Sequence, residues 1–196
     1  MTHAYDNPGH EGPLAEFTAL RQEIDRKMTS QQQASNLQVT ISGAVFGFVI
    51  TNQDRVALLL VLPLTTYMLF GRYATYHAAI HDAATYIREV LDGKVPGGLG
   101  WERWILDYKR PRLPAISSID PLFIQYPGVA ILSLLWLAPK LFIDSWHVPV
   151  GQRIALIALW FLGLATTLVT IHLTWRVRQH WIRAWTKRSK SATLTD

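Results

Sequence analysis

Residues 154–175 read IALIALWFLGLATTLVTIHLTW, a run of 22 residues without a Lys, Arg, Asp or Glu. An α-helix needs about 20 apolar residues to cross the roughly 30 Å hydrocarbon core of a bilayer. A helix on the core of a soluble protein keeps a polar face over such a length, and this stretch has none. It therefore predicts a transmembrane helix.

A second clear span is predicted at residues 122–143. Pro127 and Pro139 within it are expected to bend the helix, because proline removes a backbone donor and crowds the preceding turn. Lys140 stands near the end of this block, from where its long side chain can reach the membrane surface.

Two shorter apolar blocks come earlier in the chain. They extend with mildly polar residues to 34–51 and 56–73, and the turn TNQDR between them is short enough only for antiparallel neighbours. These lengths favour two more spans. A hairpin buried inside a soluble protein is the alternative.

The composition agrees with a membrane protein. Of 196 residues 49% are hydrophobic, only 17% are charged, and eight are Trp. The absence of Cys excludes disulfides and Cys-ligated metal sites.

The net charge of +5 is distributed as in a protein that crosses a membrane several times. Of the 19 Lys and Arg, 16 fall in the segments 1–34, 72–121 and 176–196. Cytoplasmic segments carry the excess of Lys and Arg, which predicts a multi-pass protein with both termini inside. Basic residues that border apolar blocks also argue against nucleic acid as the partner.

The expected fold class is all-α and integral to the membrane, with four transmembrane helices arranged as two hairpins. An N-terminal cytoplasmic amphipathic helix precedes them, and helix 2 has a long cytoplasmic extension. The expected segments are a disordered leader (1–13), the amphipathic helix with the first hairpin and the extension (14–92), an interfacial loop (93–121), the second hairpin (122–175) and a basic cytoplasmic tail (176–196).

The amphipathic helix is predicted from an apolar stripe that follows Pro13, at three- and four-residue steps: Leu14, Phe17, Leu20, Ile24 and Met28. The stripe can pack on the other cytoplasmic helix of the same chain, or it can bind a second copy or a cytoplasmic partner. The extension of helix 2 is expected to end at Asp92–Gly93, because residues 72–92 contain no helix breaker.

Two segments carry aromatic and basic residues suited to a lipid headgroup layer. The first is a short amphipathic helix with Trp101, Trp104, Ile105 and Tyr108 on one face; the second is the tail with Arg176, Arg178, Trp181 and Trp185. Anionic lipids of the inner leaflet are the expected partner of the tail. Packing of the first segment on the cytoplasmic helices is its alternative.

His77 and His81, one helical turn apart in YHAAIHD, are the weak candidates for a metal site. A divalent metal needs further ligands, and Asp82 is turned about 100° away from His81. Neither HExxH, GxSxG, a Walker A loop nor GxGxxG occurs in the chain. We therefore expect no enzyme activity, no catalytic residue and no cofactor. We interpret the histidine pair as part of a helix end that lies in water, just outside the membrane.

Gly43 and Gly47 form a GxxxG pattern in the first span. Small residues four apart let two helices approach closely, either within the chain or between two chains, as in a homo-oligomer. Hydroxyl residues in the spans can bond to their own helix or line a narrow aqueous path in an oligomer.

The segment 72–104, RYATYHAAIHDAATYIREVLDGKVPGGLGWERW, resembles a family of small integral membrane proteins of bacteria, particularly actinomycetes. The shared motifs are LRQEI at 20–24, YIRE at 86–89 and GLGWE at 98–102. This resemblance implies a helical protein of the bacterial inner (plasma) membrane and no particular activity. The layout of the first half, helix–span–span–helix, is also similar to the SLATT-type membrane effectors, which implies oligomerisation and permeabilisation of a membrane.

These observations lead to the hypothesis of a non-enzymatic membrane protein that acts as an oligomeric, membrane-perturbing or channel-like effector. Its cytoplasmic helices would serve assembly or sensing. A membrane anchor or scaffold for a partner protein is the alternative, and a His-based metal site is the third.

Overall fold

The computed structural model describes residues 11–95, 121–143 and 149–192, and every regular element among them is helical. Four helices in these ranges are long and apolar enough to cross a membrane: Glu11–Thr51, Gln53–Leu91, Ile124–Phe142 and Val150–Val177. The prediction of an all-helical chain with four apolar helices of this length is confirmed. This finding indicates a multi-pass membrane protein.

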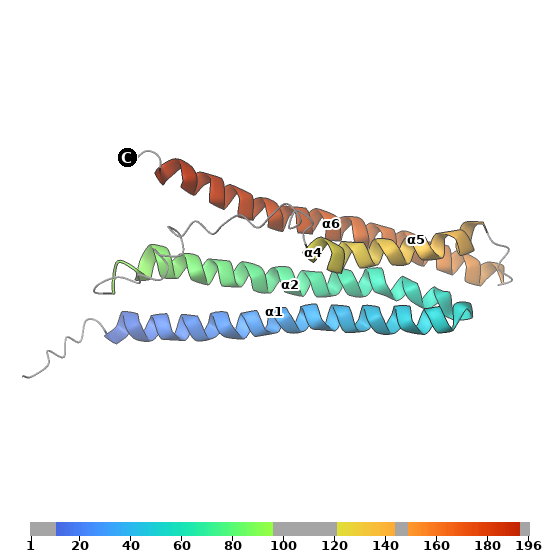
Figure 1. Cartoon of the computed structure of the whole chain (residues 1–196), viewed down its shortest axis with the longest axis horizontal. Coiled ribbons are helices and arrows are strands. Elements are labelled where there is room, and N and C mark those ends of the chain that lie inside the picture. Colours follow the sequence, from blue (N-terminus) through green and yellow to red (C-terminus); the bar gives the residue numbers. More distant parts are fainter. Residues whose placement is uncertain (1–10, 96–120, 144–148, 193–196) are drawn as a thin grey trace, which may run out of the picture. The chain divides into compact units, whose positions relative to one another are not determined.

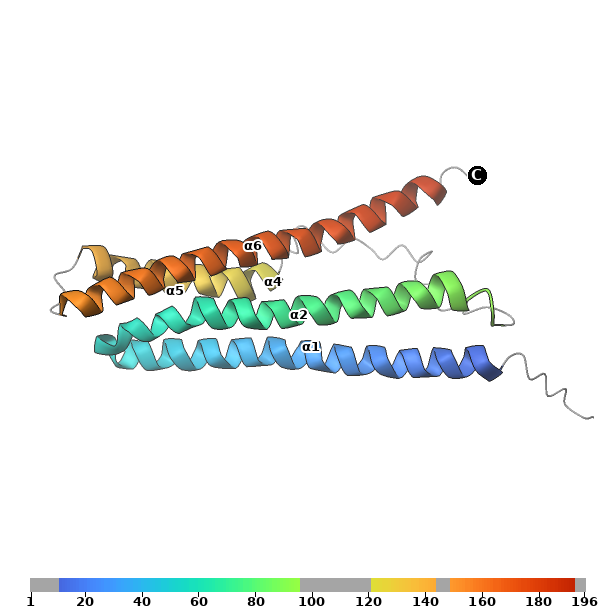
Figure 2. The same ribbon diagram turned by 180° about the vertical axis from the view of Figure 1, so that it is seen from behind.

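The helices have the following bounds. The first long helix is α1 (Glu11–Thr51), and after Asn52 the chain continues through a 3₁₀ segment, η1 (Gln53–Leu60), into α2 (Val61–Tyr86) and a π turn, η2 (Ile87–Leu91). The second half holds α4 (Pro121–Phe123), a π turn η4 (Ile124–Gly128), α5 (Val129–Phe142) and α6 (Val150–Ala192). Figures 1 and 2 show these elements from opposite sides.

The described residues form two compact units. Unit 1 consists of residues 11–33 and 73–95, and unit 2 of residues 34–72, 121–143 and 149–192. The division cuts α1 and α2 at the ends of their apolar stretches, so unit 2 holds the apolar parts of all four long helices.

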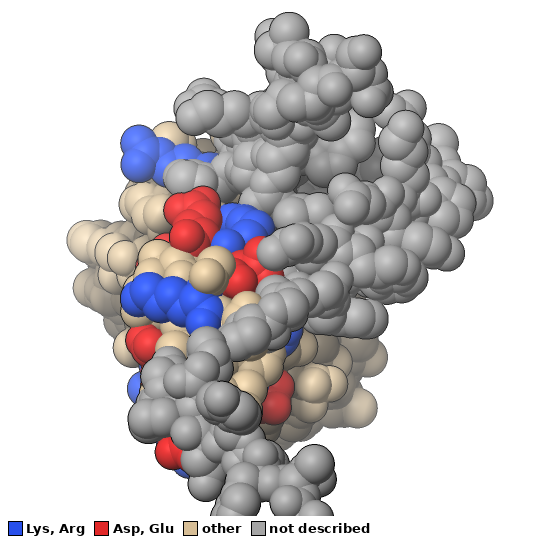
Figure 3. Space-filling view, turned by 90° about the vertical axis from the view of Figure 1, so that its left-hand side faces the viewer, with Lys and Arg blue, Asp and Glu red and all other residues tan. Residues whose placement is uncertain are grey.

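Unit 1 has a small core of its own. Ile24 of α1 is buried with Ile87 and Leu91 of η2, and Phe17 and Leu20 pack against them. The Tyr86 hydroxyl donates a hydrogen bond of 2.8 Å to the carboxylate of Glu16, and this bond raises the pKa of Tyr86. The surface of unit 1 carries charged side chains, and Figure 3 shows acidic and basic ones interspersed on the face it draws.

In unit 2, side-chain contacts connect each helix to at least two others. The Gln38 amide bonds to Thr66, and the ring of Phe46 lies 6.3 Å from that of Trp136, so α1 contacts α2 and α5. The Trp160 indole donates to the Leu134 carbonyl, and an added Cβ on Gly163 would contact Pro63, so α6 contacts α5 and α2. Within unit 2 the arrangement is therefore a four-helix bundle with α1 and α6 on one diagonal.

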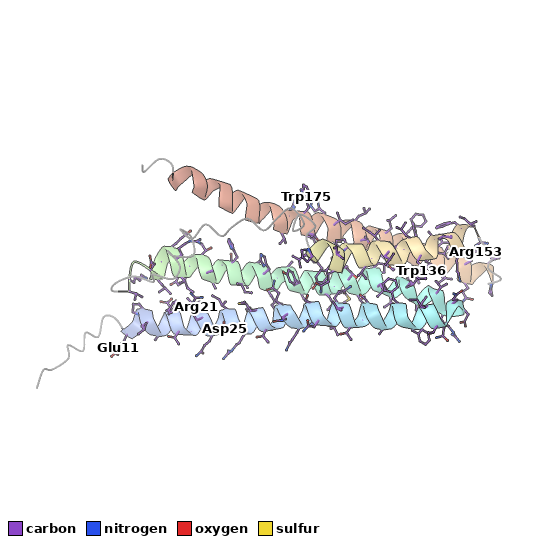
Figure 4. The ribbon with its side chains drawn as sticks, in the orientation of Figure 1. Glu11, Arg21, Asp25, Trp136, Arg153 and Trp175 are labelled. Atoms are coloured by element: carbon purple, nitrogen blue, oxygen red, sulfur yellow. The ribbon has the colours of Figure 1, made fainter. Side chains whose placement is uncertain are left out.

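The turn at Asn52, the end of α5 and the start of α6 lie at the same end of the bundle. Lys140 Nζ donates to the Gln53 carbonyl (3.2 Å), and Arg153 donates to the Leu141 carbonyl (3.1 Å). Figure 4 labels Arg153 near the start of α6. Leu141 lies in the last turn of α5, where the helix leaves carbonyls open, so Arg153 satisfies one of them. We call this end the turn end.

The part of the bundle nearest the turn end is filled by apolar side chains alone, and we call it the apolar half. Its buried residues are Val49, Val56, Leu59, Leu60, Leu62, Leu134, Leu137 and Leu141. The kink at Arg55, where the backbone leaves helical geometry, lets η1 turn into this core.

The expected bend at Pro127 takes the form of the π turn η4. A π turn holds one extra residue, and proline is tolerated there because the regular bonding ladder is already interrupted. The turn buries Tyr126 edge-on against Phe70, with 5.2 Å between ring centroids. Gln125 in the same turn donates to the Ser35 carbonyl and hydroxyl.

The outward surface of unit 2 is apolar. Leu135 of α5 and Ile154 and Phe161 of α6 are 64%, 63% and 55% exposed. Trp136 and Trp175, both labelled in Figure 4, are likewise exposed. Only 17% of the most apolar stretch of α6 is buried. Asn36, Thr40 and His172 are polar residues exposed on the same unit, but so many large exposed apolar side chains suit hydrocarbon better than water.

Gly163 is the closest helix approach that the structure shows at a glycine. An added Cβ would lie 3.2 Å from Leu134 Cδ2 and 3.3 Å from Pro63 Cβ and Cγ. We expect Gly163→Leu to destabilise the protein by about 1–3 kcal/mol, because overpacking displaces both neighbours. Thermal denaturation in detergent measures the loss.

Ala165→Leu is the matched control, because Ala165 is exposed on the same helix. It should leave the midpoint nearly unchanged. Equal midpoints for the two variants would contradict the close packing of α6 on α2 and α5.

Candidate functional site on the outer face of α1

Gly43 and Gly47 lie on the face of α1 that points away from the interior of unit 2. At about 100° per residue, Gly47 is directly opposite Gln38, which is fully buried. Both glycines are exposed. The apolar block around them is therefore packed on one side and open on the side of the glycines.

A side chain at either glycine would meet open space. An added Cβ at Gly43 or Gly47 has no heavy atom within 4 Å, whereas the same atom at Gly163 would touch two helices. Of the two interpretations of the GxxxG pattern, packing within the chain has no partner helix among the described residues.

The same face continues with Asn36 and Thr40, and both are exposed. The Thr40 hydroxyl donates to the Asn36 carbonyl (2.9 Å), so it is satisfied by its own helix. The carboxamide of Asn36 offers two donors and an acceptor toward the outside. In hydrocarbon such a group favours contact with another helix.

The apolar stripe of unit 1 divides into two parts. Phe17, Leu20 and Ile24 pack against η2, which is the intramolecular alternative for the stripe. Leu14 and Met28 are 55% and 54% exposed, so they extend the stripe on the outside of the unit.

The histidine pair does not converge with further ligands. His77 is half-buried with its ring parallel to that of Tyr73 (6.2 Å between centroids), and His81 is exposed. No group of three or more His, Cys, Asp or Glu residues that could hold a metal occurs in the described ranges. Within these ranges, the pair lacks the additional ligands that a metal site requires.

The surroundings of His77, which lies beyond the predicted span 56–73, shift its pKa. Burial lowers the pKa of His77, and the positive charge of His81 lowers it further. His77 therefore holds its proton less tightly than a free imidazole does.

We expect His81→Ala to raise the pKa of His77, because removal of a like charge favours the protonated ring. The shift is expected to be partial, since burial is the larger cause. An NMR titration of the His77 ring in detergent measures it, with His172→Ala in unit 2 as the control. A pKa of His77 that stays constant in His81→Ala would contradict the coupling.

The predicted membrane-interface residues are only partly covered by the structure. Trp101, Trp104, Ile105 and Tyr108 lie outside the described residues. Arg176 is exposed on α6, which continues to Ala192, and it follows the exposed Trp175. Arg178, Trp181 and Trp185 belong to the part of α6 whose side chains the structure does not describe.

The sequence patterns do not single out Gln38, whose amide is buried inside unit 2. Gln38 Nε2 donates to Thr66 Oγ1 (2.8 Å) and to Ser42 Oγ (3.1 Å). The available signal was a single carboxamide within the apolar block 37–50. The cost of burying such a group in hydrocarbon marks it as a residue with a specific role.

No family model, no curated protein and no solved structure matches the chain. The site is therefore interpreted from its own geometry.

Proposed function

We propose that the protein is a self-associating membrane protein that acts as a channel-like or membrane-perturbing effector without enzymatic activity. The observation that carries this proposal is the open GxxxG face of α1. Gly43 and Gly47 are exposed on an apolar helix and have no neighbour within 4 Å of an added Cβ.

The physical reason is the cost of leaving such a face in lipid. Two helices that meet at glycines bring their backbones together and gain van der Waals contact that lipid chains provide less well. Asn36 and Thr40 on the same face add polar groups that can bond across the pair. The same face on both copies gives a two-fold contact, the most frequent symmetry of homo-oligomers.

The orientation that we propose places both termini in the cytoplasm of a bacterial cell, with unit 1 inside and the turn end outside. The distribution of Lys and Arg in the sequence supports it. The exposed Arg176 and the basic residues after it would then meet the anionic inner leaflet. In this orientation unit 1 is available to sense a cytoplasmic signal.

The double variant Gly43→Ile/Gly47→Ile tests the proposal. Two branched side chains on the contact face should weaken self-association at least about tenfold, the equivalent of about 1.4 kcal/mol. The depolarisation of the membrane on overexpression should be lost with it. Sedimentation in detergent and a potential-sensitive dye in cells are the two measurements.

Ala158→Ile/Ala165→Ile is the control, because both alanines are exposed on α6 and the added volume is similar. It should associate and depolarise like the wild type. Since the chain has no cysteine, Thr40→Cys adds an independent measure. It should form a disulfide-linked dimer on oxidation, whereas Leu135→Cys on exposed α5 should stay monomeric. A wild-type protein that is monomeric in bilayers would overturn the proposal.

Topology is tested separately. Reporters fused at Asn52 and His147 should be active outside the membrane, and reporters at Gly97 and Asp196 inside. The reason is the retention of Lys-rich and Arg-rich segments in the cytoplasm. An outside signal at Asp196 would contradict the proposed orientation.

The second candidate function is a membrane anchor for a cytoplasmic protein. The exposed Leu14 and Met28 of unit 1 favour it, because two apolar side chains on a helix suit the groove of a partner. This function predicts that overexpression leaves the membrane potential intact. It also predicts that Leu14→Glu/Met28→Glu releases the partner while Gly43→Ile/Gly47→Ile does not.

A further inference from the structure

The buried polar side chains of unit 2 avoid the apolar half of the bundle. They are Gln38 and Ser42 of α1, Thr66 of α2, Ser133 of α5, and Thr167, Thr170 and Thr174 of α6. Ser133 stands at the border, next to Leu134. We call the region of the other six the polar half.

These residues lie at similar heights along the axis of the bundle, as the contacts between helices show. Gly163 lies against Pro63 and Leu134, which fixes one common level of α6, α2 and α5. Both α2 and α6 run away from the turn end. Thr66 follows Pro63, and Thr167 follows Gly163, by about one helical turn. At about 1.5 Å per residue, the two threonines therefore lie at a similar height, one turn further from the turn end. Gln38 reaches that level through its bond to Thr66.

The hydroxyls of α6 are already engaged as donors. Thr167 donates to the Gly163 carbonyl (2.7 Å), Thr170 to the Thr166 carbonyl (2.8 Å) and Thr174 to the Thr170 carbonyl (2.8 Å). Each oxygen keeps lone pairs that can accept a further hydrogen bond. This side of the polar half therefore offers acceptors.

Gln38 adds an acceptor that the protein does not satisfy. Its side chain is fully buried, and both bonds that it makes run through Nε2. No donor among the described residues lies within hydrogen-bond distance of Oε1. A buried carbonyl without a donor is costly, more so where lipid surrounds the bundle.

We propose that the polar half is an internal water site, in which a water molecule donates one hydrogen bond to Gln38 Oε1 and its second to a threonine oxygen. Water fits because it brings two donors, and buried water typically makes about three bonds to otherwise unsatisfied groups. A cation fits worse: the predicted spans 34–51, 56–73 and 154–175 contain no Asp or Glu to balance its charge.

The inference does not rest on self-association, since all its residues belong to one bundle. The proposal divides the interior of the bundle into a polar half that holds water and an apolar half that does not. Water reaches one half, and the leucines of the apolar half form the dry barrier that keeps the bundle closed. Any path for water through a single copy would have to pass Leu59, Leu62 and Leu137.

The test is water contact measured by NMR on the full chain in lipid nanodiscs, with labelled Gln amides and Thr and Leu methyl groups. We expect cross-peaks from water to the Gln38 amide protons and to the Thr66 and Thr167 methyls, and none to the Leu137 methyls. Loss of the amide signals in Gln38→Met assigns them. Absence of water contacts at Gln38 and Thr66 would overturn the proposal.

Thermal stability in detergent gives a second readout. Met has a similar size without the amide, so Gln38→Met should lower the midpoint if Oε1 is bonded to water. A raised midpoint would show that the carbonyl was unsatisfied and would overturn the water site. Gln33→Met, at an exposed position of unit 1, is the matched control.

Replacement of choline chloride by sodium chloride at constant ionic strength separates water from a cation. The midpoint should not change. A rise with sodium that disappears in Gln38→Met would identify a cation as the ligand and overturn the assignment to water. Gly43→Ile/Gly47→Ile should keep all water contacts, so a failure of the oligomer proposal leaves this test unaffected.

Discussion

The structure depends on one constraint: the backbone of a long apolar stretch must satisfy its own N–H and C=O groups. A helix does so over every residue, and no other open element does. Four apolar stretches in one chain therefore become four helices. The helical geometry changes at η1 and η4, and both segments make side-chain bonds to other helices. Lys140 donates to the Gln53 carbonyl of η1, and Gln125 of η4 donates to the Ser35 carbonyl.

The same constraint governs the side chains. The hydroxyls of Thr40, Thr166 and Thr170 bond to carbonyls of their own helix, so they can face lipid or protein at little cost. A carboxamide has more hydrogen-bonding groups than one helix can satisfy. Gln38 is accordingly turned into the bundle, and Asn36 lies on the face that we assign to a second copy.

The sequence specifies the helices better than it specifies their faces. The long uncharged run 154–175 predicts a helix, and the structure contains it. Pro127, where the sequence predicts a bend, lies in a π turn. The block 37–50 is apolar on nearly all sides. Its periodicity therefore does not reveal that Gly43 and Gly47 point outward. That orientation follows from the bond between Gln38 and Thr66, which are 28 residues apart.

The stripe of unit 1 shows the same limit. Five apolar residues at helical spacing predict a buried face, but η2 covers only Phe17, Leu20 and Ile24. Ile80 and Ala83 of α2 pack on the same cluster, so the packing of α1 on α2 and η2 decides which residues of the stripe are buried. The close contact of Gly163 with Pro63 likewise cannot be predicted from the apolar run around Gly163, because it depends on how α6 crosses α2.

The π turn at Ile124–Gly128 has a consequence for how this chain tolerates insertions and deletions. The extra residue in this turn determines which way the side chains before it point around the helix axis, relative to those of α5. Deletion of one residue there would restore an ordinary helix and rotate the preceding segment by about 100°. Such a change would carry Gln125 and Tyr126 away from Ser35 and Phe70. The number of residues in this turn, more than their identity, therefore keeps the start of the third apolar helix in phase with the first two.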